Sequence, residues 1–124
     1  MITVDYEIYI NDYTRSYKKE TFYNLGAFVD WVFQNCDDDY KSHIFVPDPE
    51  DKRAEVMNRL PYRIQVSRCR TRGNSLWVHQ IRRDNTIIFS DGKHTNNITH
   101  WNEEVKQMCR DMLTRIKNPV FNFG

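Results

Sequence analysis

The sequence predicts an α+β domain in which helices pack on one face of an antiparallel sheet. Three observations indicate this class: strand-like alternation at the start of the chain, short β-branched and aromatic segments in the second half, and two stretches with amphipathic helical spacing. The chain has 124 residues, which fits a single domain spanning 1–124, and its 40% apolar content supplies a core. The expected element order is ββα, a short connector, then βββα.

An opening hairpin and a helix are expected first. Residues 2–10 alternate apolar and polar side chains, which is the period of a half-buried strand. Asn11-Asp12 supplies turn chemistry, so residues 16–22 are expected to return as a second strand. Apolar side chains then recur at helical spacing over residues 22–36, and Asn24 is the expected N-cap.

The middle of the chain is expected to be a connector. Asp37, Asp38 and Asp39 follow the first helix, which should stop before them because acids are unfavourable at a helix C-terminus. Residues 43–46 predict a short strand. Asp48-Pro49 has the pattern of a helix start, and Pro61 sets the end of that helix near Leu60.

A three-stranded meander is predicted over residues 62–90. Its first strand begins at Tyr62 and ends before the Gly73-Asn74 turn. The second strand, residues 76–83, leads through a two-residue loop at Asp84-Asn85 into the third strand, residues 86–89.

The last helix carries an apolar stripe from Ile98 to Ile116. Thr99 is the expected N-cap, and Glu103 lies near the positive end of the helix dipole. The Trp and Met side chains of this stripe are interpreted as core that packs against the sheet, and Ser90-Asp91-Gly92 before it as a turn.

The cysteines indicate a reducing compartment. Cys36, Cys69 and Cys109 are an odd number without a Cys-x-x-Cys pair, which predicts three reduced, partly buried thiols. The first ten residues lack a basic signal-peptide region, and no apolar run approaches the roughly 18 residues needed to span a bilayer. The expected location is cytoplasmic, without a membrane partner.

The charges are separated along the chain. The first 60 residues hold seven Lys and Arg against twelve Asp and Glu, whereas the remainder hold eleven against five. No acid occurs between Glu55 and Asp84, and the basic residues of that stretch are all arginines, whose planar fork suits phosphate and carboxylate groups. The predicted partner-binding residues are Arg63, Arg68, Arg70, Arg72, Trp77, Arg82 and Arg83. A secondary acidic surface is predicted at Asp37, Asp38, Asp39, Asp48, Glu50 and Asp51.

Three interpretations of this charge pattern stay open. Clustered arginines with Tyr62 or Trp77 suit nucleic acid, where rings stack on bases. The same residue types dominate protein interfaces. The basic meander and the acidic first half also match each other within one molecule. A net charge of +1 weighs against a dedicated nucleic-acid binder.

No catalytic or metal-binding motif is recognised in the sequence. The four histidines, His43, His79, His94 and His100, lack the spacing of a zinc site, and no Gly-rich phosphate loop is present. Cys69 and His79 are placed to meet across the hairpin, but no third group is seen to orient them. We therefore expect no cofactor, and a hydrolase or nuclease would need a carboxylate–histidine site that the sequence does not display.

The C-terminal part of the chain carries a resemblance. Phe89-Ser90-Asp91-Gly92, His100-Trp101 and the segment from Asn118 to Phe123 resemble the ends of small proteins from phages and conjugative elements of Gram-positive bacteria. Phe28-Val29-Asp30-Trp31 is similar in type. The resemblance covers about half of the chain, and no catalytic residue comes with it.

The resemblance implies a function by its setting. Small proteins of such elements often inhibit host defence, as anti-CRISPR proteins do, by occupying a surface of a nuclease effector. We therefore expect a non-enzymatic binding protein that inhibits a bacterial defence nuclease, with the effector or its RNA or DNA as partner. The alternative is a small RNA- or DNA-binding accessory protein that uses the same arginines. The oligomeric state stays open.

Overall fold

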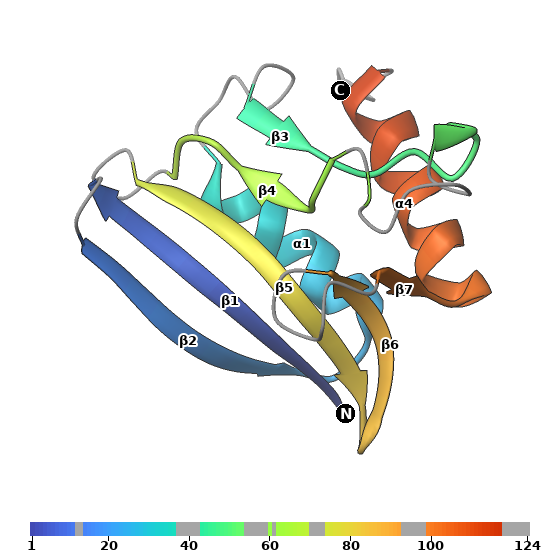
Figure 1. Ribbon diagram of the computed structural model, residues 1–124, viewed down its shortest axis with the longest axis horizontal. Helices are drawn as coiled ribbons and strands as arrows, with labels where there is room; N and C mark the ends of the chain where they lie inside the picture. Colours follow the sequence, from blue (N-terminus) through green and yellow to red (C-terminus); the bar gives the residue numbers. More distant parts are fainter. Residues whose placement is uncertain are drawn as a thin grey trace, which may run out of the picture.

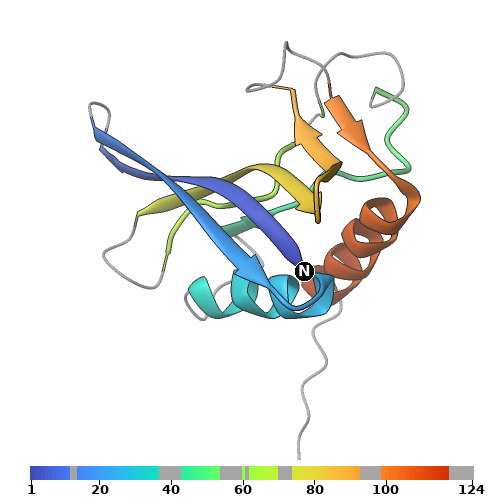
Figure 2. The same cartoon turned by 90° about the horizontal axis from the view of Figure 1, so that it is seen from below.

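The computed structural model describes residues 1–11, 14–36, 43–53, 60, 62–69, 74–92 and 99–117. The strands are β1 (Ile2–Asn11), β2 (Thr14–Phe22), β3 (Ile44–Phe45), β4 (Gln65–Val66), β5 (Ser75–Arg83), β6 (Thr86–Asp91) and β7 (Thr99–Trp101), and the helices are α1 (Leu25–Asn35) and α4 (Glu103–Lys117). Within these ranges, seven strands form one antiparallel sheet with α1 and α4 on one of its faces (Figures 1 and 2). The predicted α+β class is confirmed.

The sheet divides along β5. Its main path runs β2–β1–β5–β4–β3, and β6 pairs with β5 and continues to β7. The first half of β5 holds β4, through Trp77 and Leu76, and the second half holds β6, through the residues from Gln80 to Arg83. The strand β5 is therefore the one that joins both branches to β1.

The opening hairpin and the first helix were predicted correctly. Strands β1 and β2 pair from Ile2↔Phe22 to Asn11↔Thr14, and α1 begins after Asn24, whose side-chain oxygen accepts a hydrogen bond from the Ala27 amide at 2.8 Å. This bond satisfies one of the amides that a helix start leaves unpaired. The helix ends at Asn35, before the three aspartates, which lie outside the described residues.

The start of the last helix was predicted wrongly. Residues 99–101 form β7, and α4 begins at Glu103, with Asn102 as the cap whose Oδ1 accepts from the Val105 amide at 2.9 Å. Thr99 instead pairs with Asp91 in the sheet. A threonine and an asparagine are both good caps, and pairing with β6 decides which of them serves.

The connector differs from its prediction at one end. β3 lies where a short strand was expected, but Asp48 to Asp51 form a turn in which the Asp51 amide donates to the Asp48 carbonyl at 3.1 Å. Asp51 then accepts from the amide of Arg53, which is helical. The first helical residue described here is thus Arg53, so the helix does not start at Asp48-Pro49 as expected, and residues 54–59 lie outside the described residues. β4 is also shorter than predicted.

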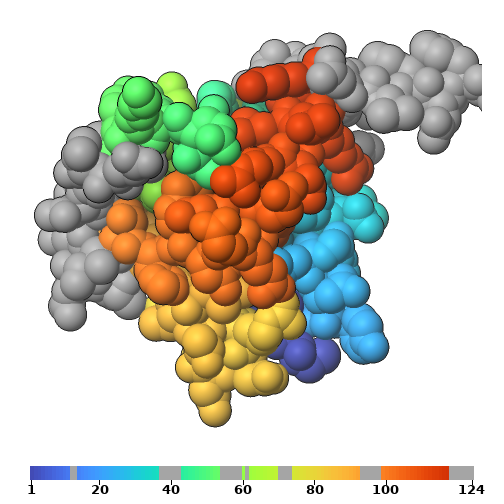
Figure 3. Space-filling view, turned by 90° about the vertical axis from the view of Figure 1, so that its right-hand side faces the viewer, coloured from blue at the N-terminus to red at the C-terminus, as the bar shows by residue number. Residues whose placement is uncertain are grey.

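The core lies between the sheet and the two helices. Strand β1 turns Ile2, Val4 and Tyr6 towards it, and the helices contribute apolar stripes that include Phe28 and Met112. Figure 3 shows α4 along one side of the molecule, beside the surface of β6 and β7. Neither helix of the described chain has the length and apolar character that crossing a membrane requires.

Candidate binding face

The face of the sheet opposite α1 and α4, here called the open face, carries the most unusual side chains. Residues directly opposite each other in a sheet share a face, so the register defines one row across five strands. That row is Phe45, Gln65, Trp77, Glu7 and Tyr17. No described helix covers the row, and in Figure 1 this face of β1, β2 and β5 is turned towards the viewer, with α1 behind it.

Four side chains of the open face form a second row, here called the cation–aromatic row: Arg15, Tyr9, Trp77 and Arg63. Arg15 lies over the Tyr9 ring at 4.8 Å, the Tyr9 and Trp77 ring centroids are 4.5 Å apart, and Arg63 lies over Trp77 at 4.3 Å. The guanidinium groups thus close both ends of an aromatic pair. Contact with Tyr17, and then with Tyr9, raises the pKa of Arg15, so its charge is retained.

Next to this row, a bulge places a histidine among acids. Asp5 pairs with Gln80 while Tyr6 pairs with Val78, so His79 is an extra residue on β5. Bulges redirect a side chain and are frequent at functional positions. The His79 ring lies between two carboxylates: its Nε2 is 2.8 Å from Glu7 and its Nδ1 is 2.7 Å from Asp91.

These three residues, here called the buried polar cluster, are almost completely removed from solvent. Glu7 and His79 are each 2% exposed and Asp91 is 7% exposed. Each ring nitrogen of His79 thus lies within hydrogen-bonding distance of one carboxylate oxygen. The Arg15 guanidinium lies 3.5 Å from the other Glu7 oxygen. Arg15, which is 48% exposed, therefore lies at the edge of the buried polar cluster and adds a cation to it.

The interpretation of Ser90-Asp91-Gly92 as a turn was wrong for its first two residues. Ser90 and Asp91 are the last residues of β6 and are buried, and the chain leaves the strand only at Gly92, with a φ of 84°. The hydroxyl of Ser90 accepts from the Gly92 amide at 3.3 Å. The strand extends this far because Asp91 pairs with Thr99 and its side chain with His79.

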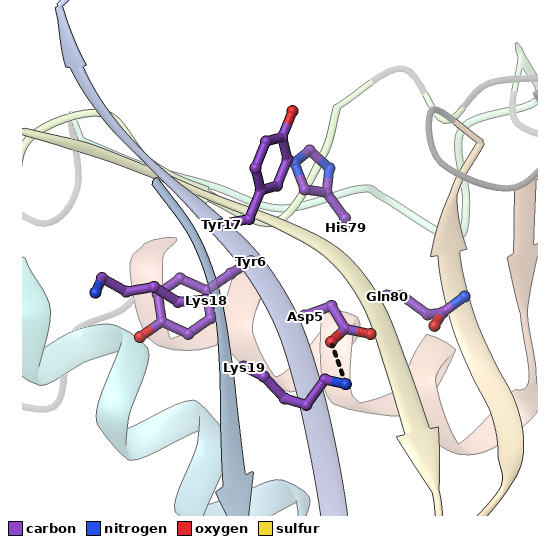
Figure 4. Close-up of a pocket in the computed structure, with 7 residues that line it drawn as sticks. All are labelled: Asp5, Tyr6, Tyr17, Lys18, Lys19, His79 and Gln80. Atoms are coloured by element: carbon purple, nitrogen blue, oxygen red, sulfur yellow. Dashed lines mark ion pairs between the residues drawn. The ribbon is translucent and has the colours of Figure 1, made fainter. Parts of the chain in front are cut away.

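A cleft of about 450 Å³ opens beside the buried polar cluster. Its lining includes Tyr17, whose ring centroid is 6.4 Å from that of His79, and Figure 4 shows the two side chains together. Asp5 on its floor is held by two cations, with Lys19 at 3.9 Å (dashed in Figure 4) and Arg82 at 3.3 Å. Lys19 is 61% exposed, whereas Asp5 and Arg82 are 30% and 28% exposed.

The predicted arginine surface is divided between several places. Arg63 and Trp77 meet in the cation–aromatic row. Arg82 binds Asp5, whereas Arg83 bonds to Glu104 of α4 on the helix side. Arg68 is exposed, and Arg70 and Arg72 lie outside the described residues, so their expected alignment with Arg68 is not described.

The predicted acidic surface is occupied by internal partners where it is described. Glu50 accepts from Arg110 at 2.9 Å, and Asp51 pairs with Arg53 at 2.8 Å, which lowers the pKa of Asp51. Asp48 accepts from the Glu50 amide. Asp37, Asp38 and Asp39 lie outside the described residues. The pairs Arg82–Asp5, Arg110–Glu50 and Arg115–Asp30 join the basic second half to the acidic first half, as the intramolecular interpretation expected.

Sequence reasoning missed the residues that complete the open face. Glu7, Tyr9, Arg15, Tyr17 and Asp91 were seen only as strand or turn residues. The alternation in β1 does place Glu7 and Tyr9 on one face, but the partners of Glu7 are 8 and 72 residues away. Only the strand order and the bulge at His79 bring these groups together.

The suggested meeting of Cys69 and His79 is replaced by other partners. Both nitrogens of His79 face carboxylates, and Cys69 pairs with Cys36 through an isolated bridge of the sheet. Burial, with a smaller contribution from Cys36, raises the pKa of Cys69 to about 11, so a reactive thiolate is disfavoured. Cys36, Cys69 and Cys109 are all buried.

The described residues include no group of three or more His, Cys, Asp or Glu side chains arranged to hold a metal ion. In comparisons with known proteins, no protein family, no curated protein and no solved structure matches this chain.

Proposed function

We propose that this chain is a non-enzymatic binding protein whose contact surface is the open face of the sheet. The observation that carries the proposal is the cation–aromatic row, in which Arg15 and Arg63 enclose Tyr9 and Trp77. Arg, Trp and Tyr dominate the binding energy of interfaces, and here stacking holds them in place before any partner arrives.

The role we assign is inhibition of a bacterial defence nuclease in the cytoplasm of a bacterial host. The resemblance to small proteins of mobile elements supports this setting. An inhibitor of this kind works by occupying a nucleic-acid or effector surface, which needs a preformed binding face. The contact residues are revised by the structure: Arg63 and Trp77 are kept, Arg15 is added, and Arg83 is removed because it bonds to Glu104.

A second candidate is a small RNA- or DNA-binding accessory protein. It is favoured by the difference in exposure between the acidic and the basic side chains of the open face. The acids Glu7 and Asp91 are buried, whereas the Arg15 and Lys19 side chains are 48% and 61% exposed. A polyanion that approaches this face meets cations first.

The buried polar cluster supports binding better than catalysis. A general acid or base has to reach a proton of the substrate within hydrogen-bonding distance. Here both nitrogens of His79 are already held by carboxylates of the protein, and the side chain is buried. We therefore assign the cluster a structural role, as the rigid floor that holds Arg15 and the strands of the open face.

The experiment is a tagged pull-down from bacterial lysate, divided into a nuclease-treated and an untreated half. An effector that survives nuclease treatment and is lost in the Arg15→Glu/Arg63→Glu variant supports the proposed function. Arg115→Glu is the matched control, since Arg115 also stacks on a ring, that of Phe33, but on the helix side. Retention of the effector by the double variant would show that the open face is not the contact surface. Recovery of nucleic acid alone would favour the accessory protein.

A further inference from the structure

We propose that the open face recognises single-stranded nucleic acid, with phosphates on its arginines and bases on its exposed rings. This inference rests on the proposed function and names the component of the effector complex that is bound. It comes from three features of the face: the pairing and exposure of its charged groups, the rings exposed at its two ends, and the support that holds the cations.

The charges suit a polyanion because the acids of this face are paired with cations, and two of those cations are well exposed. Asp5, at the floor of the cleft, is held by both Lys19 and Arg82. Glu7 is held by His79 and Arg15. Each acid is thus paired inside the protein, while Arg15 and Lys19 keep about half or more of their side-chain surface in solvent. Arginine and lysine placed in this way release counterions from a phosphate chain.

Exposed rings lie at both ends of the cation–aromatic row. Tyr17, on β2, is 62% exposed, and Tyr62 at the β3 side is 54% exposed. Tyr62 stacks on Phe45, with centroids 6.3 Å apart and planes 26° from parallel, and Phe45 lies in the row that crosses the open face. An exposed ring held by its neighbours offers a π-face on which an unpaired base can stack.

The arginines between these rings are already positioned. Arg15 is held by Tyr9 and Glu7, and Arg63 by Trp77, so little side-chain freedom is lost when a phosphate binds.

Single strands fit this face better than a duplex or an acidic protein patch. Rings can stack only on bases that are not already stacked in a helix, and a duplex would contact the cations alone. An acidic protein patch would pair with the cations, but its carboxylates would not stack on the Tyr17 and Tyr62 rings as bases do. The alternation of exposed ring, fixed arginine and exposed ring therefore points to a strand that offers bases and phosphates in turn.

The test measures binding of fluorescent single strands of about 12 nucleotides, oligo(U) and oligo(dT), and of a duplex of the same length, by anisotropy with the full chain. We expect both single strands to bind at least tenfold more tightly than the duplex. Tyr17→Ala and Tyr62→Ala should each weaken binding roughly tenfold. Arg15→Gln and Arg63→Gln should each reduce the slope of log affinity against log salt by about 0.7 between about 50 and 200 mM salt.

Controls separate loss of the site from loss of the fold. Arg115→Gln removes an arginine that is also stacked on a ring, and it should leave both affinity and slope unchanged. Thermal unfolding of each variant shows whether it is folded. Tyr17→Phe, which keeps the ring, should retain binding that Tyr17→Ala loses. Preference for oligo(U) would identify RNA as the ligand, and equal binding would identify the shared chemistry of bases and phosphates.

Two outcomes would overturn the inference. The first is equal binding of the duplex, and the second is an effect of Arg115→Gln as large as that of the two open-face arginines. If no oligonucleotide binds but the pull-down recovers a nuclease-resistant effector through Arg15 and Arg63, this inference is wrong and the proposed function stands. If oligonucleotides bind as expected but no effector is recovered, the proposed function fails and the accessory protein replaces it.

Discussion

The two faces of the sheet are built on opposite principles. The face covered by α1 and α4 buries apolar side chains such as Phe28, Phe89 and Met112, which are stabilised by removal from water. The open face buries two carboxylates and a histidine, and it compensates their desolvation by pairing them with one another. The covered face is stabilised by the apolar surface area that it buries. The open face is stable only when each of its buried polar groups has a partner.

The difference explains where binding is expected. The apolar side chains of the covered face are already packed against α1 and α4, so they offer no exposed surface to a partner. On the open face Glu7 and Asp91 are buried while Tyr17, Arg15 and Lys19 are exposed, so its outer layer is complementary to something that the chain itself does not supply. The contrast leads to predictions about how each face responds when a part is removed.

The largest effect is expected on the covered face. Phe89→Ala removes a side chain that is fully buried between sheet and helices, and it should lower the free energy of unfolding by about 3–5 kcal/mol. Chemical denaturation measures this loss. Tyr62→Ala, on the 54% exposed ring of the open face, should change the free energy of unfolding by about 0.5 kcal/mol or less. Equal losses for the two variants would contradict the division into a core face and a binding face.

A loss of about 3 kcal/mol or more is expected from His79→Leu, because it leaves Glu7 and Asp91 buried without their shared partner. Denaturation of the triple variant Glu7→Leu/His79→Leu/Asp91→Leu should recover most of this loss, since removing every member removes the unpaired charges as well. His100→Leu, at an exposed position of β7, is the control and should have little effect. If the triple variant is no more stable than His79→Leu, the cluster is not held by mutual pairing.

Alkaline pH should destabilise the covered face through its thiol. Burial raises the pKa of Cys109 from 9.0 to about 12, so between these values the unfolded chain has lost the proton that the folded chain keeps. The free energy of unfolding should therefore be unaffected by this group below pH 9 and should fall above it by about 1.4 kcal/mol per pH unit. Denaturation of Cys109→Ala from pH 8 to about pH 11 should show a slope shallower than that of the original chain by this amount. Parallel slopes would mean that the thiol is not held in its neutral form.

The covered face could be predicted from the sequence because its signals are local. Alternation in residues 2–10, the helical stripe that ends at Cys36 and the Asn24 cap each depend on residues a few positions apart. The hairpin loop at Asp84-Asn85 is equally local, with Asp84 in the left-handed region at a φ of 53°. These elements were predicted close to their observed bounds.

The open face could not be predicted because its signals depend on strand order. Glu7 and His79 are 72 residues apart, and their contact requires that β1 lies beside β5 and that β5 has a bulge at His79. The arginine-rich stretch was recognised from composition, but its members divide between the two faces because alternation along β5 separates Arg82 from Arg83. Charge counts along a chain carry no information on which face receives each charge.

The start of α4 also depended on strand pairing that the local sequence does not show, and the change in stability predicted there is the smallest. Both Thr99 and Asn102 are chemically suitable caps, and pairing of β7 with β6 selects Asn102 for the helix that covers the core. Asn102→Ala should lower the free energy of unfolding by about 1 kcal/mol because the Val105 amide loses its acceptor. Asn102→Asp keeps an acceptor oxygen at the positive end of the helix dipole, so denaturation should show it to be close to the original chain. Thr99→Ala is the deciding comparison. If helix content falls in Thr99→Ala but not in Asn102→Ala, Thr99 is the N-cap, as the local sequence pattern predicted. The helix would then start at residues 99–101, which the structure assigns to β7.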